Sequence, residues 1–308
     1  MTQHDTMQLA FLQRATLGEG LQWHAPTASW WWTDIEGAAI HAWNPETKEA
    51  ASYKMPDRVG SFVHCRSGRV VAGMAKWLGM VTLPQDAARP PQIQTLVAVD
   101  AAEPRTRIND GRTDRRGYYV FGTMNEAPER RPIGSFYQYS QRHGLRRLAL
   151  PAVAIANSIC FSLDGATMYF ADTMERRIMQ CDYDAEAAQV GAPRLFAEVN
   201  EPQAWPDGSI IDAEGCLWNA RWGGARVVRY APDGTELLVL QVPVKNVTCP
   251  AFGGADYAQL MVTTARQEMN AEELEQMPEA GSLFTLAEAG FKGVPDALFD
   301  DEGYLPRQ

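Results

Sequence analysis

Residues 160–170 read CFSLDGATMYF and residues 210–218 read IIDAEGCLW, and the two stretches share one pattern. In each, a short apolar strand leads into a turn with Asp and Gly, and a second apolar or aromatic strand follows. Gly tolerates the positive φ of tight turns, and aromatic residues favour strands. The pattern therefore predicts a β-hairpin, and its recurrence along the chain decides the fold.

The second strand of this hairpin occurs six times, each time ending in a small residue. The copies are SWWWTD near Thr33, RVVAG at Gly73, YYVFG at Gly122, TMYFA at Ala171, CLWNA at Ala220 and LMVTT at Thr263. Neighbouring copies are 40, 49, 49, 49 and 43 residues apart. A near-constant period of this size is typical of repeat architectures.

Most copies are followed by a further strand of alternating pattern, such as RRIMQCDYD (176–184), and helical periodicity is almost absent. Four short strands in each of six units predict an all-β protein, a six-bladed β-propeller with four-stranded blades around a central channel. A two-sheet sandwich is the alternative, but it would not produce the period. We expect a single propeller domain over residues 1–308, in which residues 10–17 supply the outer strand that closes the ring.

One segment breaks the repeat. Residues 267–281, QEMNAEELEQMPEAG, contain helix-forming residues with Asn270 as a candidate N-cap. They predict a short helix inserted in the sixth blade. An insertion over one face of a rigid scaffold is a usual place for binding elements, so both a lid and a passive decoration remain open.

Composition narrows the class of partner. The net charge of −10 argues against nucleic acid, whose binding relies on Lys and Arg, and no basic cluster suggests a membrane surface. The five widely spaced cysteines predict reduced thiols, and no signal peptide or membrane-spanning run is recognised. We therefore expect a cytoplasmic protein, a monomer or weak oligomer, with a small-molecule partner.

The repeat also predicts where the innermost strand of each blade begins. Four polar residues lie 13 or 14 positions before the small residue of their copy: Glu19, Asn109, Asn157 and Asp207. In a propeller, this phase marks the entrance to the strand that lines the channel. These four side chains are therefore expected to meet at one mouth of the axis.

Two turn-forming tripeptides illustrate the distinction. Pro206-Asp207-Gly208 and Pro232-Asp233-Gly234 have the same composition, which is typical of a turn. The second lies about 13 residues after its anchor and is expected to be an outer hairpin turn. The first is expected to face the axis and carry chemistry.

Two carboxylates brought together without a cation would repel each other. A divalent metal removes that cost, and oxygen ligands favour a hard ion, so we expect Glu19, Asn157 and Asp207 to bind one divalent metal ion. Ca²⁺ is favoured by ligand type, and Zn²⁺, Mn²⁺, Mg²⁺ and Fe²⁺ are the alternatives.

The segments LGEG, RINDG, GTM, AIANS, PDGSIIDAEGCLW and WGGARVVRYAPDG resemble the senescence-marker/regucalcin/gluconolactonase family of six-bladed propellers, most closely bacterial sugar-acid lactonases. The resemblance extends from about Leu17 to Leu286. It implies metal ligands at Glu19, Asn157 and Asp207. It also implies contacts with sugar hydroxyls at Arg107 and Asn109, and a further substrate contact at Glu126.

The resemblance implies metal-dependent hydrolysis of a sugar lactone to the aldonic acid. Asp207 is expected to act as general acid and base as well as ligand, because a water near the metal lies within its reach. Met124 and Trp222 are candidates for the pocket wall. The competing hypotheses are a broader metal-dependent esterase or phosphotriesterase, and a calcium-binding propeller without catalysis.

Overall fold

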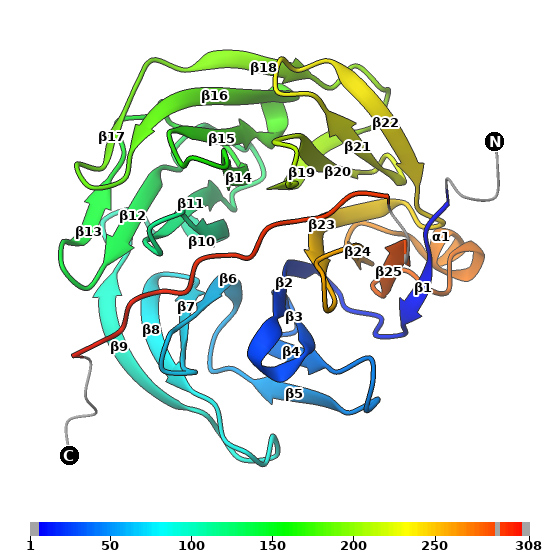
Figure 1. The fold of residues 1–308 in the computed structure, drawn as a ribbon, viewed down its shortest axis with the longest axis horizontal. Helices are drawn as coiled ribbons and strands as arrows, with labels where there is room; N and C mark the ends of the chain where they lie inside the picture. The colour runs from blue at the N-terminus through cyan, green and yellow to red at the C-terminus, as the bar shows by residue number, and fades with distance from the viewer. Residues whose placement is uncertain (1–5, 287–289, 304–308) are drawn as a thin grey trace.

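Six antiparallel sheets are arranged around a common axis like the blades of a propeller (Figure 1). The computed structural model describes residues 6–286 and 290–303. Within them, the six copies of the sequence repeat form the second strand of each blade, counted from the axis. The predicted all-β six-bladed propeller is confirmed.

The strands of the blades fall into four concentric sets. The innermost strands are β2 (Gly18–His24), β6 (Val59–His64), β10 (Thr106–Thr113), β14 (Ala156–Phe161), β19 (Trp205–Ile211) and β23 (Asn246–Gly253). The second strands are β3 (Ser29–Asp34), β7 (Val70–Met74), β11 (Tyr119–Asn125), β15 (Thr167–Asp172), β20 (Leu217–Trp222) and β24 (Gln259–Ala265). The third strands are β4 (Ala39–Trp43), β8 (Trp77–Thr82), β12 (Phe136–Ser140), β16 (Arg177–Asp184), β21 (Arg226–Tyr230) and β25 (Leu283–Leu286). The outer strands are β5 (Ala50–Lys54), β9 (Gln92–Ala98), β13 (Gly144–Arg147), β18 (Arg194–Glu198), β22 (Glu236–Gln241) and β1 (Gln8–Phe11).

The fourth blade differs from the predicted four strands. The long strand β16 pairs with β18 over Arg177–Gln180 and with the two-residue strand β17 (Gln189–Val190) at Tyr183 and Asp184. A turn joins β16 to β17, so β17 extends a hairpin at the end of β16. The outer strand of this blade is β18.

The ring is closed by strand pairing between the two ends of the chain. β1 pairs antiparallel with β25, so the N-terminal strand completes the sixth blade (Figure 1). Phe11 of this strand packs on the rings of Trp32 and Trp43 of the first blade, with centroids 5.6 and 5.0 Å apart. The prediction that an N-terminal strand closes the ring is confirmed, but its bounds were wrong: of the expected residues 10–17 only Ala10 and Phe11 belong to the strand.

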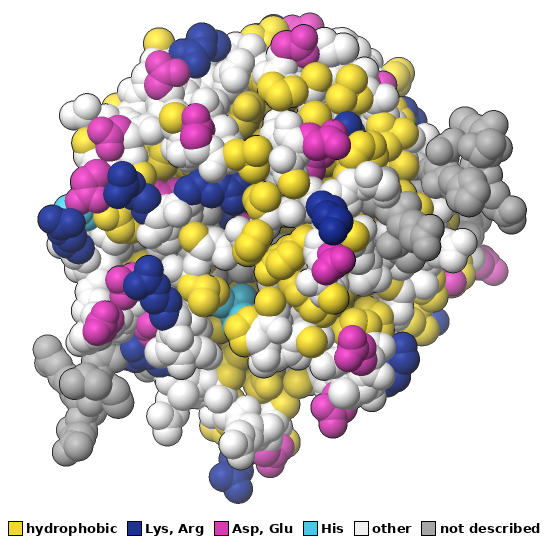
Figure 2. Space-filling model, viewed as in Figure 1, with side chains coloured by type: hydrophobic (Ala, Val, Ile, Leu, Met, Phe, Trp, Pro, Cys, Tyr) yellow, Lys and Arg dark blue, Asp and Glu magenta, His cyan; other side chains and the backbone are white. Residues whose placement is uncertain are grey.

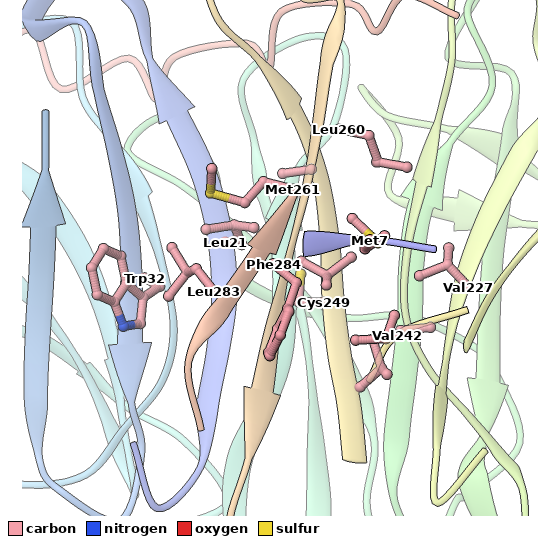
Figure 3. Close-up of a cluster of buried hydrophobic side chains, with 14 of the residues drawn as sticks. Met7, Leu21, Trp32, Val227, Val242, Cys249, Leu260, Met261, Leu283 and Phe284 are labelled. Atoms are coloured by element: carbon pink, nitrogen blue, oxygen red, sulfur yellow. The ribbon is translucent and has the colours of Figure 1, made fainter. Parts of the chain in front are cut away.

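Hydrophobic side chains fill the spaces between blades. Figure 3 shows the largest cluster, in which Met7 and Leu21 from the N-terminal part pack with Cys249, Leu283 and other residues from the sixth blade. The alternating apolar residues of the strands therefore face neighbouring blades, as the sheet-packing of a propeller requires. All five cysteines are buried and free, which agrees with the predicted unpaired thiols.

A C-terminal segment, residues 291–301, crosses the ring in Figure 1 (red). It contacts the far ends of inner strands: Asp296 pairs with Arg112 at 2.8 Å, and Phe299 N donates to His64 O at 2.9 Å. It also accepts a hydrogen bond at Ala297 O from Thr113 Oγ1. This C-terminal segment therefore covers the end of the channel opposite the predicted site.

The predicted insertion lies between β24 and β25. Its helix α1 (Ala271–Gln276) is shorter than the insertion, and turns at residues 267–268 and 278–281 flank it. Asn270 is its N-cap, as predicted, and shares a capping box with Glu273. Two short 3₁₀ helices, η1 (Ala25–Thr27) and η2 (Thr173–Glu175), join second strands to their neighbours. None of the helices in the described parts of the chain is long and apolar enough to cross a membrane.

Charged side chains on the molecular surface are mixed in sign. On the face shown in Figure 2, Lys and Arg side chains lie among Asp and Glu side chains, with hydrophobic ones between them. The described residues on this face therefore do not form a continuous basic surface, in keeping with the acidic net charge.

Candidate functional site

A cavity of about 330 Å³ opens where the innermost strands begin. Its polar lining includes five predicted site residues: Glu19, Arg107, Asn109, Asn157 and Asp207. Its apolar walls are Leu17, Met124, Ile155, Met174, Trp205 and Trp222, and its remaining lining residues are Arg130, Thr173, Gln267 and Glu268. The structure thus brings together predicted site residues that lie up to 188 positions apart in the sequence, from Glu19 to Asp207.

Irregular pairing aims these side chains at the axis. The register between first and second strands shifts between Glu19 and Gln22, between Ile108 and Gly111, between Asn157 and Cys160, and between Pro206 and Ser209. A β-bulge adds a residue on one strand and redirects the side chains next to it. The Pro206-Asp207-Gly208 tripeptide is therefore a bulge within β19, and the expectation of a turn there was wrong.

The second Pro-Asp-Gly tripeptide behaves as predicted. Residues 231–235 connect β21 to the outer strand β22, and Asp233 Oδ1 accepts a hydrogen bond from Thr235 N at 2.9 Å. The two identical tripeptides thus differ in structure because Pro206-Asp207-Gly208 lies near the start of a channel-lining strand, whereas Pro232-Asp233-Gly234 lies at the outer rim.

A chain of hydrogen bonds fixes the amides of the site. Arg107 Nη1 donates to Asn109 Oδ1 at 2.7 Å, and Asn109 Nδ2 donates to Asn157 Oδ1 at 3.2 Å. Asn157 Nδ2 in turn donates to Thr173 Oγ1 at 2.8 Å. Both amide nitrogens therefore donate to protein acceptors, and the Asn157 carbonyl oxygen, which accepts the bond from Asn109, has a second lone pair that a cation could use.

Two carboxyl groups meet at the base of the cavity. Asp207 is 4% exposed, and its side chain is hydrogen-bonded to that of Glu19. Burial, and then the charge of Asp110, raise the pKa of Glu19 to about 8. Burial and the charges of Glu19 and Asp110 raise the pKa of Asp207 well above its ordinary value. Without a cation, burial and the neighbouring negative charges therefore favour protonation of this pair.

Asp110 is a third carboxylate that sequence reasoning missed. It follows Asn109 within the bulge of β10, and its Oδ2 accepts a hydrogen bond from Ile159 N at 2.8 Å. Burial raises its pKa. The repeat argument assigned one site residue to each blade, whereas the bulge in β10 turns two neighbouring side chains inward. The adjacent Asn109 and Asp110 in the sequence were the signal that could have predicted this third carboxylate.

These residues fit a divalent cation. Carboxylate oxygens of Glu19 and Asp207 and the amide oxygen of Asn157 are hard donors, and the uncompensated carboxyls carry the electrostatic cost that a cation removes. A second group, Asp212, Glu214 and Cys216, has a different character. Arg229 Nη2 pairs with Asp212 at 2.8 Å and with Glu214 at 2.5 Å, so those carboxylates already have their counter-charge.

Glu126 lies beside the cavity but does not line it. Its carboxylate accepts hydrogen bonds from Arg58 at 2.6 and 3.0 Å and lies 3.5 Å from Arg107 Nε. Although burial opposes it, the bonds from Arg58 and the charge of Arg107 lower the pKa of Glu126. In this structure it is a partner of Arg107, and its predicted contact with substrate stays a prediction.

The propeller, its axial carboxylates and the arginine-amide pair define the class of protein. Residues 17–266 match the family described as SMP-30/Gluconolactonase/LRE-like region, and the chain belongs to that family.

Particular relatives narrow the comparison. The chain is 40% identical to L-arabinolactonase of Azospirillum brasilense over 291 residues, 92% of this chain and 94% of that protein. It is 33% identical to regucalcin of Oryctolagus cuniculus, over 90% of this chain and 93% of that protein. The structure of a regucalcin from Agrobacterium tumefaciens, described as a calcium-binding protein, superposes with a TM-score of 0.85 at 29% identity. That superposition covers 94% of this chain and 97% of that one.

Proposed function

We propose that this protein is a cytoplasmic, divalent-metal-dependent lactonase that hydrolyses a sugar lactone to the aldonic acid. The observation that carries the proposal is the meeting of Glu19, Asp207 and Asn157 with Arg107 and Asn109 in one cavity. The similarity to an L-arabinolactonase over nine-tenths of both chains supports the same reaction class.

In this proposal, Glu19, Asn157 and Asp207 hold the cation, with Ca²⁺ favoured by their oxygen donors. When bound, the cation supplies Lewis-acid polarisation of the lactone carbonyl. It also offsets the mutual repulsion of the carboxylates, so Asp207 is ionised and able to accept a proton.

Asp207 performs the proton transfers. It takes a proton from a water whose oxygen attacks the carbonyl carbon, and the bond between that carbon and the ring oxygen then breaks. Asp207 returns the proton to the ring oxygen, which leaves as a hydroxyl of the aldonic acid. Glu19, hydrogen-bonded to Asp207 and to Gly20 N, keeps this carboxylate in place.

Arg107 and Asn109 orient the sugar. Arg107 is 4% exposed, and within the described residues only its Nη1 forms hydrogen bonds, to Asn109 and to Ile108 O. Arg107 Nε lies 3.5 Å from Glu126 Oε1, and in this proposal the remaining guanidinium donors bind hydroxyl oxygens of the sugar. Trp205 and Trp222 supply flat apolar walls for the C–H face of a sugar ring. The site therefore suits a polyhydroxylated lactone better than an apolar ester or a phosphotriester.

The test is acid release from a panel of arabinono-, xylono-, galactono- and gluconolactones by chelator-stripped protein, with and without added divalent ions. Asp207→Asn keeps an oxygen ligand but removes the proton acceptor, so we expect metal-dependent stabilisation to persist in part while turnover falls by at least about 10²-fold. Asp233→Asn, in the identical outer tripeptide, is the matched control and should retain full activity. If no lactone is hydrolysed faster than it opens spontaneously, whichever ion is added, the proposed lactonase function is refuted.

A calcium-binding role without catalysis is the second candidate, favoured by the structure of the calcium-binding regucalcin. The same experiment separates the two functions. Stabilisation by Ca²⁺ without turnover of any lactone would support binding alone.

A further inference from the structure

The residues at the start of the insertion form a fixed part of the cavity wall. The backbone N–H groups of Arg266 and Gln267 donate to Thr16 O at 3.1 and 2.9 Å. Asn246 Nδ2, on a side chain only 1% exposed, donates to Gln267 O at 2.9 Å. This stretch is therefore tied both to the segment preceding β2 and to β23.

The helix that follows is anchored as well. Lys245 Nζ pairs with Glu273 Oε1 at 2.6 Å, and Glu273 also belongs to the capping box with Asn270. Apolar side chains of the insertion pack against the largest core cluster: Met269, Leu274 and Met277. Of the two roles left open by the sequence, these contacts argue against a swinging lid, since both ends of the stretch are fixed to the ring.

Two polar side chains of this wall are unpaired. Gln267, which is half-buried, and Glu268, which is exposed, line the cavity, and their side chains form no hydrogen bond or ion pair within the described residues. Glu268 has a left-handed backbone, with φ of 61°, and lies between the anchored Gln267 and the helix α1. A strained backbone held in place beside a ligand cavity is a common feature of binding sites.

The position of this wall determines which part of a ligand it meets. The proposed cation ligands come from the first, fourth and fifth blades, and the hydroxyl-binding Arg107 and Asn109 come from the third. The sixth blade, with β23 and β24, lies across the ring from β10 and β11 (Figure 1). A lactone with its carbonyl at the carboxylates and its ring hydroxyls at Arg107 therefore directs its free end toward Gln267 and Glu268.

We propose that Gln267 and Glu268 bind the terminal hydroxyl of the lactone side chain and thereby determine which sugar lactones are accepted. This inference rests on the proposed lactonase function and concerns the specificity of the same site. The carboxylate of Glu268 accepts a hydrogen bond from the hydroxyl, and the amide of Gln267 donates to the same oxygen atom.

The test compares the best-hydrolysed lactone with the analogue that lacks only the terminal hydroxyl. Suitable pairs are L-arabinono-1,4-lactone with its 5-deoxy analogue, and D-galactono-1,4-lactone with D-fucono-1,4-lactone. We expect wild-type kcat/KM to favour the hydroxylated member by roughly tenfold, the effect of one charge-assisted hydrogen bond. In Glu268→Ala this preference should fall to about twofold or less, mainly through KM.

Two further variants serve as controls. Glu268→Gln keeps a hydrogen-bonding group and should restore part of the preference. Glu275→Gln, on the exposed surface of α1 outside the cavity, should leave it unchanged. A wild-type enzyme indifferent to the terminal hydroxyl, or an equal change of kcat/KM for both lactones in Glu268→Ala, would overturn the assignment while leaving the lactonase standing. No turnover of any lactone by the wild type overturns the proposed function itself.

Discussion

Replacing Glu19 by Gln should stabilise the metal-free protein while weakening its response to metal, because the amide keeps an oxygen ligand but loses the negative charge. The substituted amide retains the size of the side chain, the acceptor for Gly20 N and the hydrogen bond with Asp207. It removes one carboxyl group from a site where burial and Asp110 raise the pKa of Glu19 to about 8. The sign of the effect follows from proton linkage.

In the metal-free folded protein, Glu19 binds a proton more tightly than in the unfolded chain, where its pKa has the ordinary value of 4.5. Unfolding therefore releases a proton between these two pKa values, and the free energy of unfolding falls as pH rises. At pH 7 the gap to the ordinary pKa corresponds to a ceiling of about 3 kcal/mol, at roughly 1.4 kcal/mol for each pH unit. Glu19 keeps part of its surface accessible and is coupled to Asp207, so we expect about 1–2 kcal/mol.

The assay is thermal unfolding of chelator-treated wild type and Glu19→Gln at pH 5 and pH 8, with and without Ca²⁺. At pH 8 the metal-free variant should unfold about 3–6 °C above the metal-free wild type, and at pH 5 the two should nearly coincide. Added Ca²⁺ should stabilise the wild type more at pH 8 than at pH 5, and it should stabilise the variant less than the wild type at pH 8. A metal-free variant that is less stable than wild type at pH 8 would refute the electrostatic reasoning.

Three further outcomes are expected. Asp296→Asn removes the charge that pairs with Arg112, whose side chain is 10% exposed, and should lower the free energy of unfolding by about 1–3 kcal/mol in a urea titration. An unchanged midpoint would mean that the C-terminal segment does not stabilise the ring. Deleting residues 1–12 removes β1 and exposes the edge of β25, so a large loss of stability by circular dichroism is expected; native-like melting would contradict closure by β1. Arg107→Lys should raise KM for the lactone about tenfold or more with a smaller change in kcat, because an ammonium cannot reproduce the guanidinium contacts with Asn109 and substrate, and an unaltered KM would argue against this role.

Part of the site was predictable from the repeat. Glu19, Asn109, Asn157 and Asp207 share one phase, and a propeller repeats the same strand at the same distance from the axis. Residues at the same position of the repeat therefore lie close together in the folded protein. The same argument separated Asp207 from Asp233, although their neighbours are identical.

The positions of other site residues depend on local irregularities of the strands, which a fixed sequence period cannot predict. The bulge in β10 turns both Asn109 and Asp110 inward, and the bulge in β19 replaces the turn expected at Asp207. Glu126 is paired with Arg58, which lies just before β6, far from Glu126 in the sequence. Such pairings depend on which side chains meet across blades.

The sequence by itself determined the number of blades, the strand that carries each axial residue and the place of the insertion. Those features follow from local hydrophobic patterning and turn residues, which act within a few positions of the chain. Only the tertiary structure decided that Gln267 and Glu268 line the cavity and that residues 291–301 cover the opposite end of the channel. Both placements depend on hydrogen bonds to distant backbone groups, such as Thr16 O and His64 O, and every residue type offers those same groups.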